Sequence, residues 1–232
     1  MICAIMNTQL TEIAFILDRS GSMQSQAGAA ISGFNDFLRQ QKDTPGETRF
    51  TLVLFNSQYE VPANAIPLAE VVDLDSSTYE PRGNTALLDA IGRTIDDIGA
   101  RLAATAEPAR PGQVIIAILT DGLENASRQY NLAQVSERIA HQREIYKWQF
   151  FFLGANQDAI ATAAAMRIDR DSASNFAADD QGILGSSLAM SRKISAVRKM
   201  SVGAAMSMQE EADLHASLSK LQKEEDRKQR EK

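Results

Sequence analysis

Residues 13–23 of the chain read IAFILDRSGSM, and they decide the fold class. The first five form an apolar run that is too short for a helix and shows no alternation of apolar and polar residues. Such a run is typical of a strand that is buried on both faces of a parallel sheet. Comparable, mainly apolar runs follow at 50–55, 114–119 and 150–153. We therefore expect all four runs to be buried strands of one parallel sheet.

Segments with the period of a helix separate these runs. Apolar residues recur at steps of three and four over 87–102, which predicts a helix that the Glu107-Pro108 pair closes. Residues 31–38 predict a second helix, and Asn131 is the expected N-cap of a weaker third helix. The alternation predicts an α/β fold, a doubly wound, mostly parallel and Rossmann-like sheet with helices on both faces.

The remaining segments complete this prediction at its edges. Two prolines, Pro62 and Pro67, place 60–72 in an edge strand or hairpin arm. Further elements are expected as a helix at 156–166, a short strand at 172–176 and a last helix at 179–199. After Leu221 no apolar residue remains. We therefore divide the chain into a domain over 1–199 and a charged tail over 200–232 that is partly helical and then disordered.

Composition limits the function classes. The 232 residues are 44% hydrophobic, which supports one sizeable core, and a formal charge of −6 makes nucleic acid an unexpected partner. The single cysteine, Cys3, excludes an intramolecular disulfide and fits a reducing compartment. No run approaches the roughly 20 apolar residues of a membrane span, and the start lacks a basic leader region, so we expect a cytoplasmic protein. Met6 is an alternative start to Met1.

Three loops carry oxygen ligands at predicted ends of strands or starts of helices. Asp18, Ser20 and Ser22 occupy every second position directly after the first strand. Thr85 precedes the helix at 87–102, and Asp121 directly follows the strand at 114–119. Ligands of open α/β sheets sit beyond the carboxyl ends of the strands. A set of carboxylates and hydroxyls selects Mg²⁺, Mn²⁺ or Ca²⁺ over zinc or copper, and leaves a coordination position for an acidic group from outside.

The order Asp-x-Ser-x-Ser, Gly-x-Thr and Thr-Asp-Gly resembles the von Willebrand factor A domain with its metal-ion-dependent adhesion site, over about residues 10–199. The resemblance implies that Ser20, Ser22 and Thr85 coordinate Mg²⁺ directly, and that Asp18 and Asp121 do so directly or through water. It also implies that Gly83 and Gly122 shape their loops. A Glu or Asp carboxylate of a partner protein is then expected at the free position.

The resemblance further implies a bacterial, cytoplasmic adaptor that acts beside an AAA+ ATPase, a chelatase or a stress-system component. In this family the last helix can shift when the site takes a ligand. Here that helix carries Arg192, Lys193, Arg198 and Lys199 without an acidic residue over 187–200. We expect a solvated basic face, with an acidic partner or anionic lipid as the alternative. We also hypothesise that the tail couples partner binding to a second contact.

Other functions have weaker support in the sequence. A Mg²⁺-dependent phosphohydrolase could use Asp18 as its nucleophile, but the second carboxylate expected two residues later is replaced by Ser20. Gly-x-Ser-x-Gly and a phosphate-binding P-loop are both missing from the sequence, so neither a serine hydrolase nor an NTPase is indicated. An RNA-associated role is disfavoured by the acidic charge. Glu124, Asn125 and Ser127 are expected at a solvated helix start, with a role at the rim of the site as the alternative.

Overall fold

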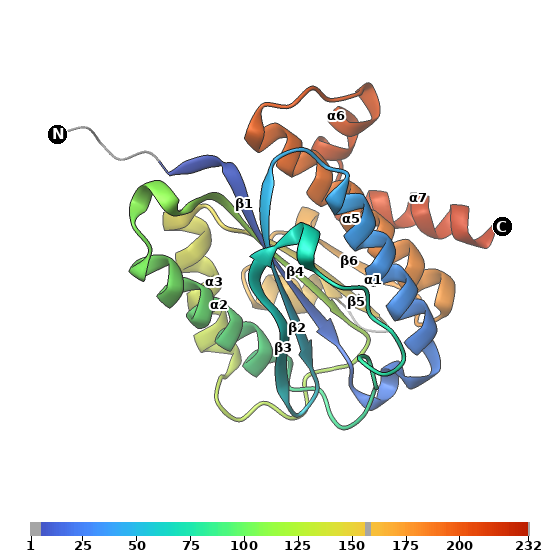
Figure 1. The fold of residues 1–232 in the computed structure, drawn as a ribbon. Helices are drawn as coiled ribbons and strands as arrows, with labels where there is room; N and C mark the ends of the chain where they lie inside the picture. Colours follow the sequence, from blue (N-terminus) through green and yellow to red (C-terminus); the bar gives the residue numbers. More distant parts are fainter. Residues whose placement is uncertain (1–5, 156–158, 232) are drawn as a thin grey trace.

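Strand β1 (Asn7–Asp18) lies near the middle of a six-stranded sheet with the order β3-β2-β1-β4-β5-β6 (Figure 1). The structure is a computed structural model that describes residues 6–155 and 159–231. The other strands are β2 (Glu47–Phe55), β3 (Tyr59–Pro67), β4 (Pro111–Thr120), β5 (Gln149–Ala155) and β6 (Ala173–Phe176). Only β3, at the edge, pairs antiparallel. This arrangement confirms the predicted doubly wound, mostly parallel sheet.

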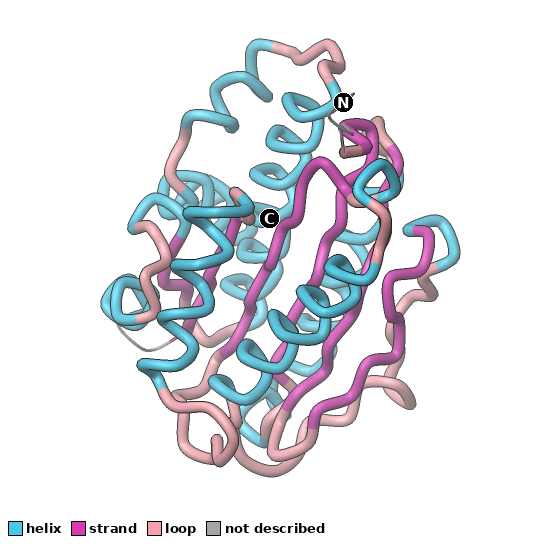
Figure 2. Tube along the Cα trace, turned by 90° about the vertical axis from the view of Figure 1, so that its left-hand side faces the viewer, coloured by secondary structure: helices cyan, strands magenta, loops and turns pink. Residues whose placement is uncertain are grey.

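Helices cover both faces of the sheet (Figures 1 and 2). They are α1 (Ala27–Lys42), α2 (Leu87–Ala104), α3 (Leu132–Tyr146), α4 (Ala159–Ala165), α5 (Asp180–Val202), α6 (Met208–His215) and α7 (Leu218–Arg230). Short 3-10 helices are η1 (Gly21–Gln26), η2 (Leu68–Glu70), η3 (Glu107–Ala109) and η4 (Arg170–Ser172). The predicted helix at 156–166 starts outside the described residues, and its described part is α4.

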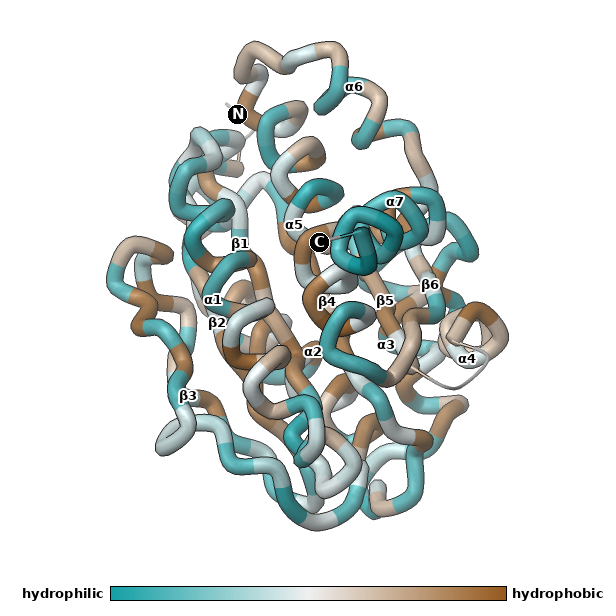
Figure 3. Tube along the Cα trace, turned by 90° about the vertical axis from the view of Figure 1, so that its right-hand side faces the viewer, coloured by the Kyte–Doolittle hydropathy of each residue, from teal (hydrophilic) through white to brown (hydrophobic). Residues whose placement is uncertain are grey.

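The buried strands supply side chains to two separate cores. Phe15 and Leu17 of β1 pack beneath α1 and α5, whereas Ala14 and Ile16 pack beneath α2 and α3. All four side chains are buried, which explains why the run carries no polar alternation. Figure 3 shows hydrophobic residues along these strands and hydrophilic residues on the outer helices.

Two local predictions about helix and strand ends are also confirmed. Asn131 caps α3 in a capping box, in which its side chain accepts from the Gln134 backbone N–H. The proline-containing segment forms the edge strand β3, whose free side tolerates the missing N–H groups. Both predictions rest on short stretches of sequence, and the tertiary structure keeps the local conformation that these stretches favour.

The end of the chain differs from the prediction of disorder. Residues 218–230 form α7, and Leu218 and Leu221 are buried in the core cluster shared with α1 and α5. The rest of α7 is polar and is held by ion pairs. Arg192 of α5 binds Glu224 and Glu225 of α7, with nitrogen–oxygen distances of 3.1 and 2.7 Å. The tail therefore packs on α5, and the proposed boundary at residue 199 stays a prediction.

The four basic residues of α5 do not form a solvated face. Arg192 also pairs with Asp213 of α6, at 2.5 Å. Lys193 donates to the backbone carbonyls of Leu214 and Ala216 at 2.7 and 2.6 Å, which neutralises the carbonyl end of α6. Lys199 pairs with Glu210 at 2.5 Å. The tail thus covers this side of α5.

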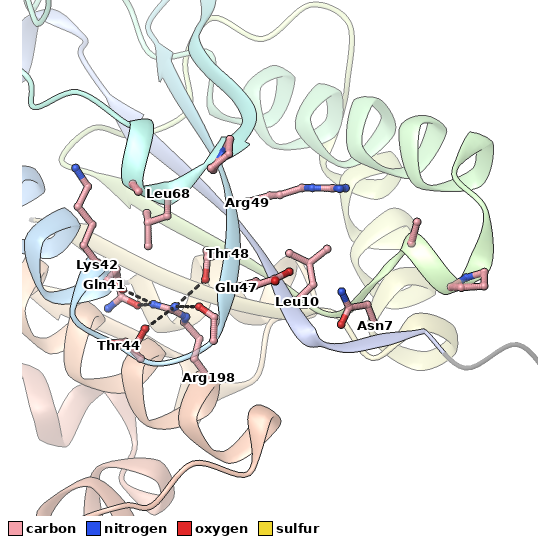
Figure 4. A pocket seen from close by; sticks show the side chains of 15 residues that line it. Asn7, Leu10, Gln41, Lys42, Thr44, Glu47, Thr48, Arg49, Leu68 and Arg198 are labelled. Atoms are coloured by element: carbon pink, nitrogen blue, oxygen red, sulfur yellow. Dashed lines mark hydrogen bonds between the residues drawn. The ribbon is translucent and has the colours of Figure 1, made fainter.

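Arg198 is buried and fixes α5 to the end of α1 (Figure 4). Its guanidinium donates to the backbone oxygen and to Oε1 of Gln41, at 2.7 and 2.9 Å, and to Thr48 Oγ1 at 2.7 Å. Burial lowers its pKa to about 10. The group lies against a cavity of about 680 Å³ at the end of the sheet remote from Asp18. Arg198 acts as a carbonyl cap for α1 and is removed from solvent.

Within 6–155 and 159–231, no helix combines the length and the apolar composition that a bilayer crossing needs.

Candidate metal centre

The candidate site lies where the strand order reverses. After β1 the chain adds β2 and β3 on one side, and later adds β4, β5 and β6 on the other side. Asp18 ends β1 and Asp121 follows β4, so the two carboxylates come from neighbouring strands at the same edge of the sheet. In open α/β sheets, ligands bind in the crevice at this switch point.

Asp18 is fully buried and has both carboxylate oxygens occupied. Oδ1 accepts from the Ser20 backbone N–H at 2.7 Å, and Oδ2 accepts from Thr120 Oγ1 at 2.5 Å. Burial raises the pKa of Asp18 to about 6, although these hydrogen bonds oppose the rise. The protein therefore holds a carboxylate that is costly to ionise without a nearby cation.

Hydrogen bonds connect the first and third loops. Ser22 Oγ donates to Asp121 Oδ1 at 2.6 Å, and the Ser20 and Ser22 hydroxyl oxygens are 3.0 Å apart. The pKa of Asp121 is also raised, mainly by burial. Two serine hydroxyls and a second carboxylate thus lie within hydrogen-bond reach of one another.

The second loop is attached to the first through its backbone. Gly83 has φ 74°, a conformation that favours glycine, and its carbonyl accepts from the Gly21 backbone N–H at 2.9 Å. Thr85 is buried, and its backbone N–H donates to Asn125 Oδ1 at 2.9 Å. This attachment holds Thr85 beside the loop that carries Ser20 and Ser22.

Gly122 allows Thr85 to approach the third loop. A Cβ atom at Gly122 would lie 2.7 Å from Thr85 Oγ1 and 3.5 Å from Ser22 Oγ. The Thr85 hydroxyl therefore lies against this glycine, close to the Ser22 hydroxyl. The structure thus brings Asp18, Ser20, Ser22, Thr85 and Asp121 to one edge of the sheet. Their roles as ligands stay a prediction.

Two residues beside Asp18 were missed by the sequence interpretation. Thr120 donates to the Asp18 carboxylate, and the buried Tyr79 donates from Oη to the Asp18 backbone carbonyl. Thr120 belongs to the Thr-Asp-Gly motif, but the motif alone does not predict that its hydroxyl binds Asp18. Tyr79 lies 61 residues from Asp18 and had no signal in the sequence.

The loop after Asp121 is not a helix start, because α3 begins only at Leu132. Glu124 accepts from the backbone N–H of Leu88 at 2.9 Å, and Ser127 Oγ accepts from that of Asp89 at 3.0 Å. These side chains satisfy donors in the first turn of α2, a role usually taken by the N-cap. Asn125 holds the Thr85 backbone. These contacts reach distant parts of the chain, so the expected helix start was wrong, whereas a role at the rim of the site stays a prediction.

The chemistry of the donor set fits a hard divalent cation. Asp18 and Asp121 are two carboxylates whose pKa values are raised by burial, and a cation would favour their ionised forms. The other three donors are hydroxyl oxygens. Within the described ranges there is no cluster of three or more His, Cys, Asp or Glu side chains suited to a metal. Any metal centre here must therefore rely on the serine and threonine hydroxyls.

Comparisons by sequence give no relative. No protein-family model matches the chain, and no curated protein is significantly similar to it. The fold is nevertheless shared with solved structures.

Three such structures are von Willebrand factor A folds or contain a related domain. Proximal thread matrix protein 1 from the mussel byssus, in a form with a zinc-occupied MIDAS motif, has TM-score 0.54, 14% identity, and coverage of 86% of this chain and 48% of its own. A von Willebrand factor type A protein from Catenulispora acidiphila has TM-score 0.53 and 16% identity, and the match covers 80% of this chain and 42% of that protein. Manganese-loaded TRAP protein from Plasmodium vivax has TM-score 0.52 and 15% identity, and the match covers 76% of this chain and 72% of that protein. This chain thus spans about half the length of the mussel protein and somewhat less than half of the Catenulispora protein. The likeness establishes the fold.

Proposed function

We propose that this chain, which has the von Willebrand factor A fold, is a metal-dependent module for binding another protein. The observation that carries the proposal is the contact between Ser22 and Asp121, which joins loops 99 residues apart at the switch point of the sheet. Asp18 and Thr85 lie beside this contact. Asp, Ser, Ser, Thr and Asp in this order also form the adhesion-site motif that the sequence resembles.

In this proposal Ser20, Ser22 and Thr85 hold Mg²⁺ directly, and Asp18 and Asp121 hold it directly or through water. Mn²⁺ and Ca²⁺ are alternative ions because all five donors are hard oxygens. The zinc-occupied mussel protein and the manganese-loaded Plasmodium protein support divalent binding on this fold. When bound, the ion supplies an electrophilic position that accepts an acidic side chain.

The residues of this chain fix the geometry before a partner arrives. Thr120 and the Ser20 backbone orient the Asp18 carboxylate, and Ser22 orients that of Asp121. Asn125 and the glycine at position 122 place Thr85. Because these contacts are already made, partner binding requires little ordering of the loops. The proposed ligand is a Glu or Asp carboxylate of a partner protein.

The proposed setting is an adaptor in the bacterial cytoplasm whose partner is an AAA+ ATPase or a stress-system component. This part of the proposal comes from the family resemblance and the single cysteine. The net charge of −6 gives no general attraction to nucleic acid.

A phosphohydrolase with Asp18 as nucleophile is the alternative, and the residue two positions after Asp18 weighs against it. The position two residues later is Ser20, which supplies no second carboxylate. We therefore propose a module without catalytic activity.

Thermal unfolding with and without Mg²⁺ tests the metal site, since an ion that binds only the folded state raises the melting temperature. Wild type should gain stability in Mg²⁺ and lose it in EDTA, whereas Asp18→Ala should not respond. Asp73→Ala is the matched control, because Asp73 is exposed in a loop. Mg²⁺-dependent phosphatase turnover that Asp18→Asn abolishes would instead establish the hydrolase.

A further inference from the structure

A polar hollow of about 420 Å³ opens beside the candidate metal centre. Its lining includes Ser57, Asn84, Asn125, Arg128 and Gln129. Asn125 connects the two places directly, because its Oδ1 accepts from the Thr85 backbone N–H and its own N–H donates to the Thr85 carbonyl at 3.0 Å. The hollow therefore adjoins the loop that carries Thr85.

Two charged side chains, Asp89 and Arg128, line the hollow, and they differ in their bonding. Asp89 lines it, but its carboxylate accepts from three backbone N–H groups, those of Arg128, Gln129 and Tyr130, at 2.8 to 2.9 Å. No hydrogen bond or ion pair of the Arg128 guanidinium occurs among the residues that the structure describes. Among the described residues, the charged group of the hollow without a bonded partner is thus the Arg128 guanidinium.

The backbone of Arg128 is held in place although its side chain is exposed. Its N–H is bound by Asp89, which lies in the first turn of α2. The neighbouring Arg93 differs, because its guanidinium stacks on Tyr59 at 4.3 Å from the ring centroid and approaches Asp97 at 3.6 Å. Arg128 is the one arginine among the residues that line the hollow, and its guanidinium is available to a ligand.

We propose that the hollow accepts a second acidic side chain of the partner, so that the module recognises a segment with two carboxylates. One carboxylate occupies the metal centre and the other meets Arg128. Of the eight residues that line the hollow only Ala126 is apolar, so an apolar side chain would gain little there. This inference rests on the proposed function, because the first carboxylate requires the metal.

The expected gain in affinity is modest. Arg128 is exposed, and an exposed charge pair strengthens binding by roughly two- to five-fold. The gain should shrink when salt is raised, because screening acts on pairs that water reaches.

Synthetic peptides provide the probe. We would measure binding of capped, fluorescent peptides with the pattern Asp, a glycine spacer, and Glu to the full chain loaded with Mg²⁺. Spacers of different lengths are needed, and each peptide has a twin in which Gln replaces Glu. For at least one spacer the Glu peptide should bind about three-fold more tightly than its Gln twin. Arg128→Gln should remove this difference, and Arg39→Gln, on the exposed surface of α1, should keep it.

The outcomes separate this inference from the proposed function. Equal binding of Glu and Gln peptides at every spacing overturns the inference, as does a difference that survives in Arg128→Gln. If binding of both peptides is unaffected by EDTA and by Asp18→Ala, or if neither peptide binds, the proposed function fails and the inference fails with it. Mg²⁺-dependent binding with no preference for Glu leaves the proposed function intact.

Discussion

Replacing Asp18 by Asn should stabilise the metal-free protein at alkaline pH. Asp18 is buried, and its pKa is about 6 in the folded state against an ordinary value of 3.8. The folded protein therefore retains this proton over a pH range in which the unfolded chain has lost it. Stability consequently falls as the pH rises from about 4 to above 6, and the difference in pKa corresponds to about 3 kcal/mol.

The asparagine variant avoids this cost but keeps part of the hydrogen bonding. Its side-chain oxygen can still accept from the Ser20 backbone N–H, whereas its amide group must face Thr120 Oγ1, which then has to accept. The rearrangement offsets part of the gain, so we expect about 1–3 kcal/mol at pH 8. The gain should shrink toward zero near pH 4, where Asp18 is protonated in the folded protein.

Urea unfolding in EDTA, repeated from pH 8 to pH 4, measures this effect. Asp73→Asn is the control, because it removes the same charge from an exposed loop. In Mg²⁺ the order should reverse, since wild type gains stability from the ion and Asp18→Asn does not. A variant that is less stable than wild type by the same amount at every pH would refute the reasoning.

Other consequences follow from single contacts. Gly122→Ala should weaken Mg²⁺ binding about ten-fold by calorimetry, because its Cβ would displace the Thr85 hydroxyl, and unchanged affinity would contradict the placement of Thr85 at the site. Leu218→Ala should lower the free energy of unfolding by about 2–5 kcal/mol in urea, as a buried leucine does, whereas a disordered tail predicts no change. Leu123, which is 63% exposed beside Asp121, should contact a partner, so Leu123→Ser should reduce partner capture without altering the Mg²⁺ response. The control Leu132→Ser, on α3, should leave both partner capture and the Mg²⁺ response unchanged.

The sheet could be predicted because its signals are local. Runs such as that at 13–17 are buried on both faces, so their apolar character identifies the strands without any knowledge of their neighbours. The ends of those strands then placed Asp18 and Asp121 at one edge, since parallel strands on the two sides of a switch point share it. The fold class and the proximity of the loops therefore follow from patterns within single segments.

The tail and the loop after Asp121 could not be predicted, because both depend on distant partners. Only Leu218 and Leu221 anchor α7 in the core, and its polar half is held by Arg192, which the sequence presented as part of a solvated face. Glu124 satisfies a backbone donor of α2, 36 residues earlier in the chain. Composition does not identify such pairings, since a charged residue that binds a specific partner resembles one that faces water.

The most direct test of the central claim is the position of a bound Mn²⁺ ion, located by anomalous scattering in crystals of the full chain. Mn²⁺ replaces Mg²⁺ at oxygen sites and is visible at its absorption edge. The proposal predicts one strong peak at bonding distance from the hydroxyls of Ser22 and Thr85, and beside the carboxylate of Asp121. A crystal saturated with Mn²⁺ that shows no peak at these three residues would contradict it.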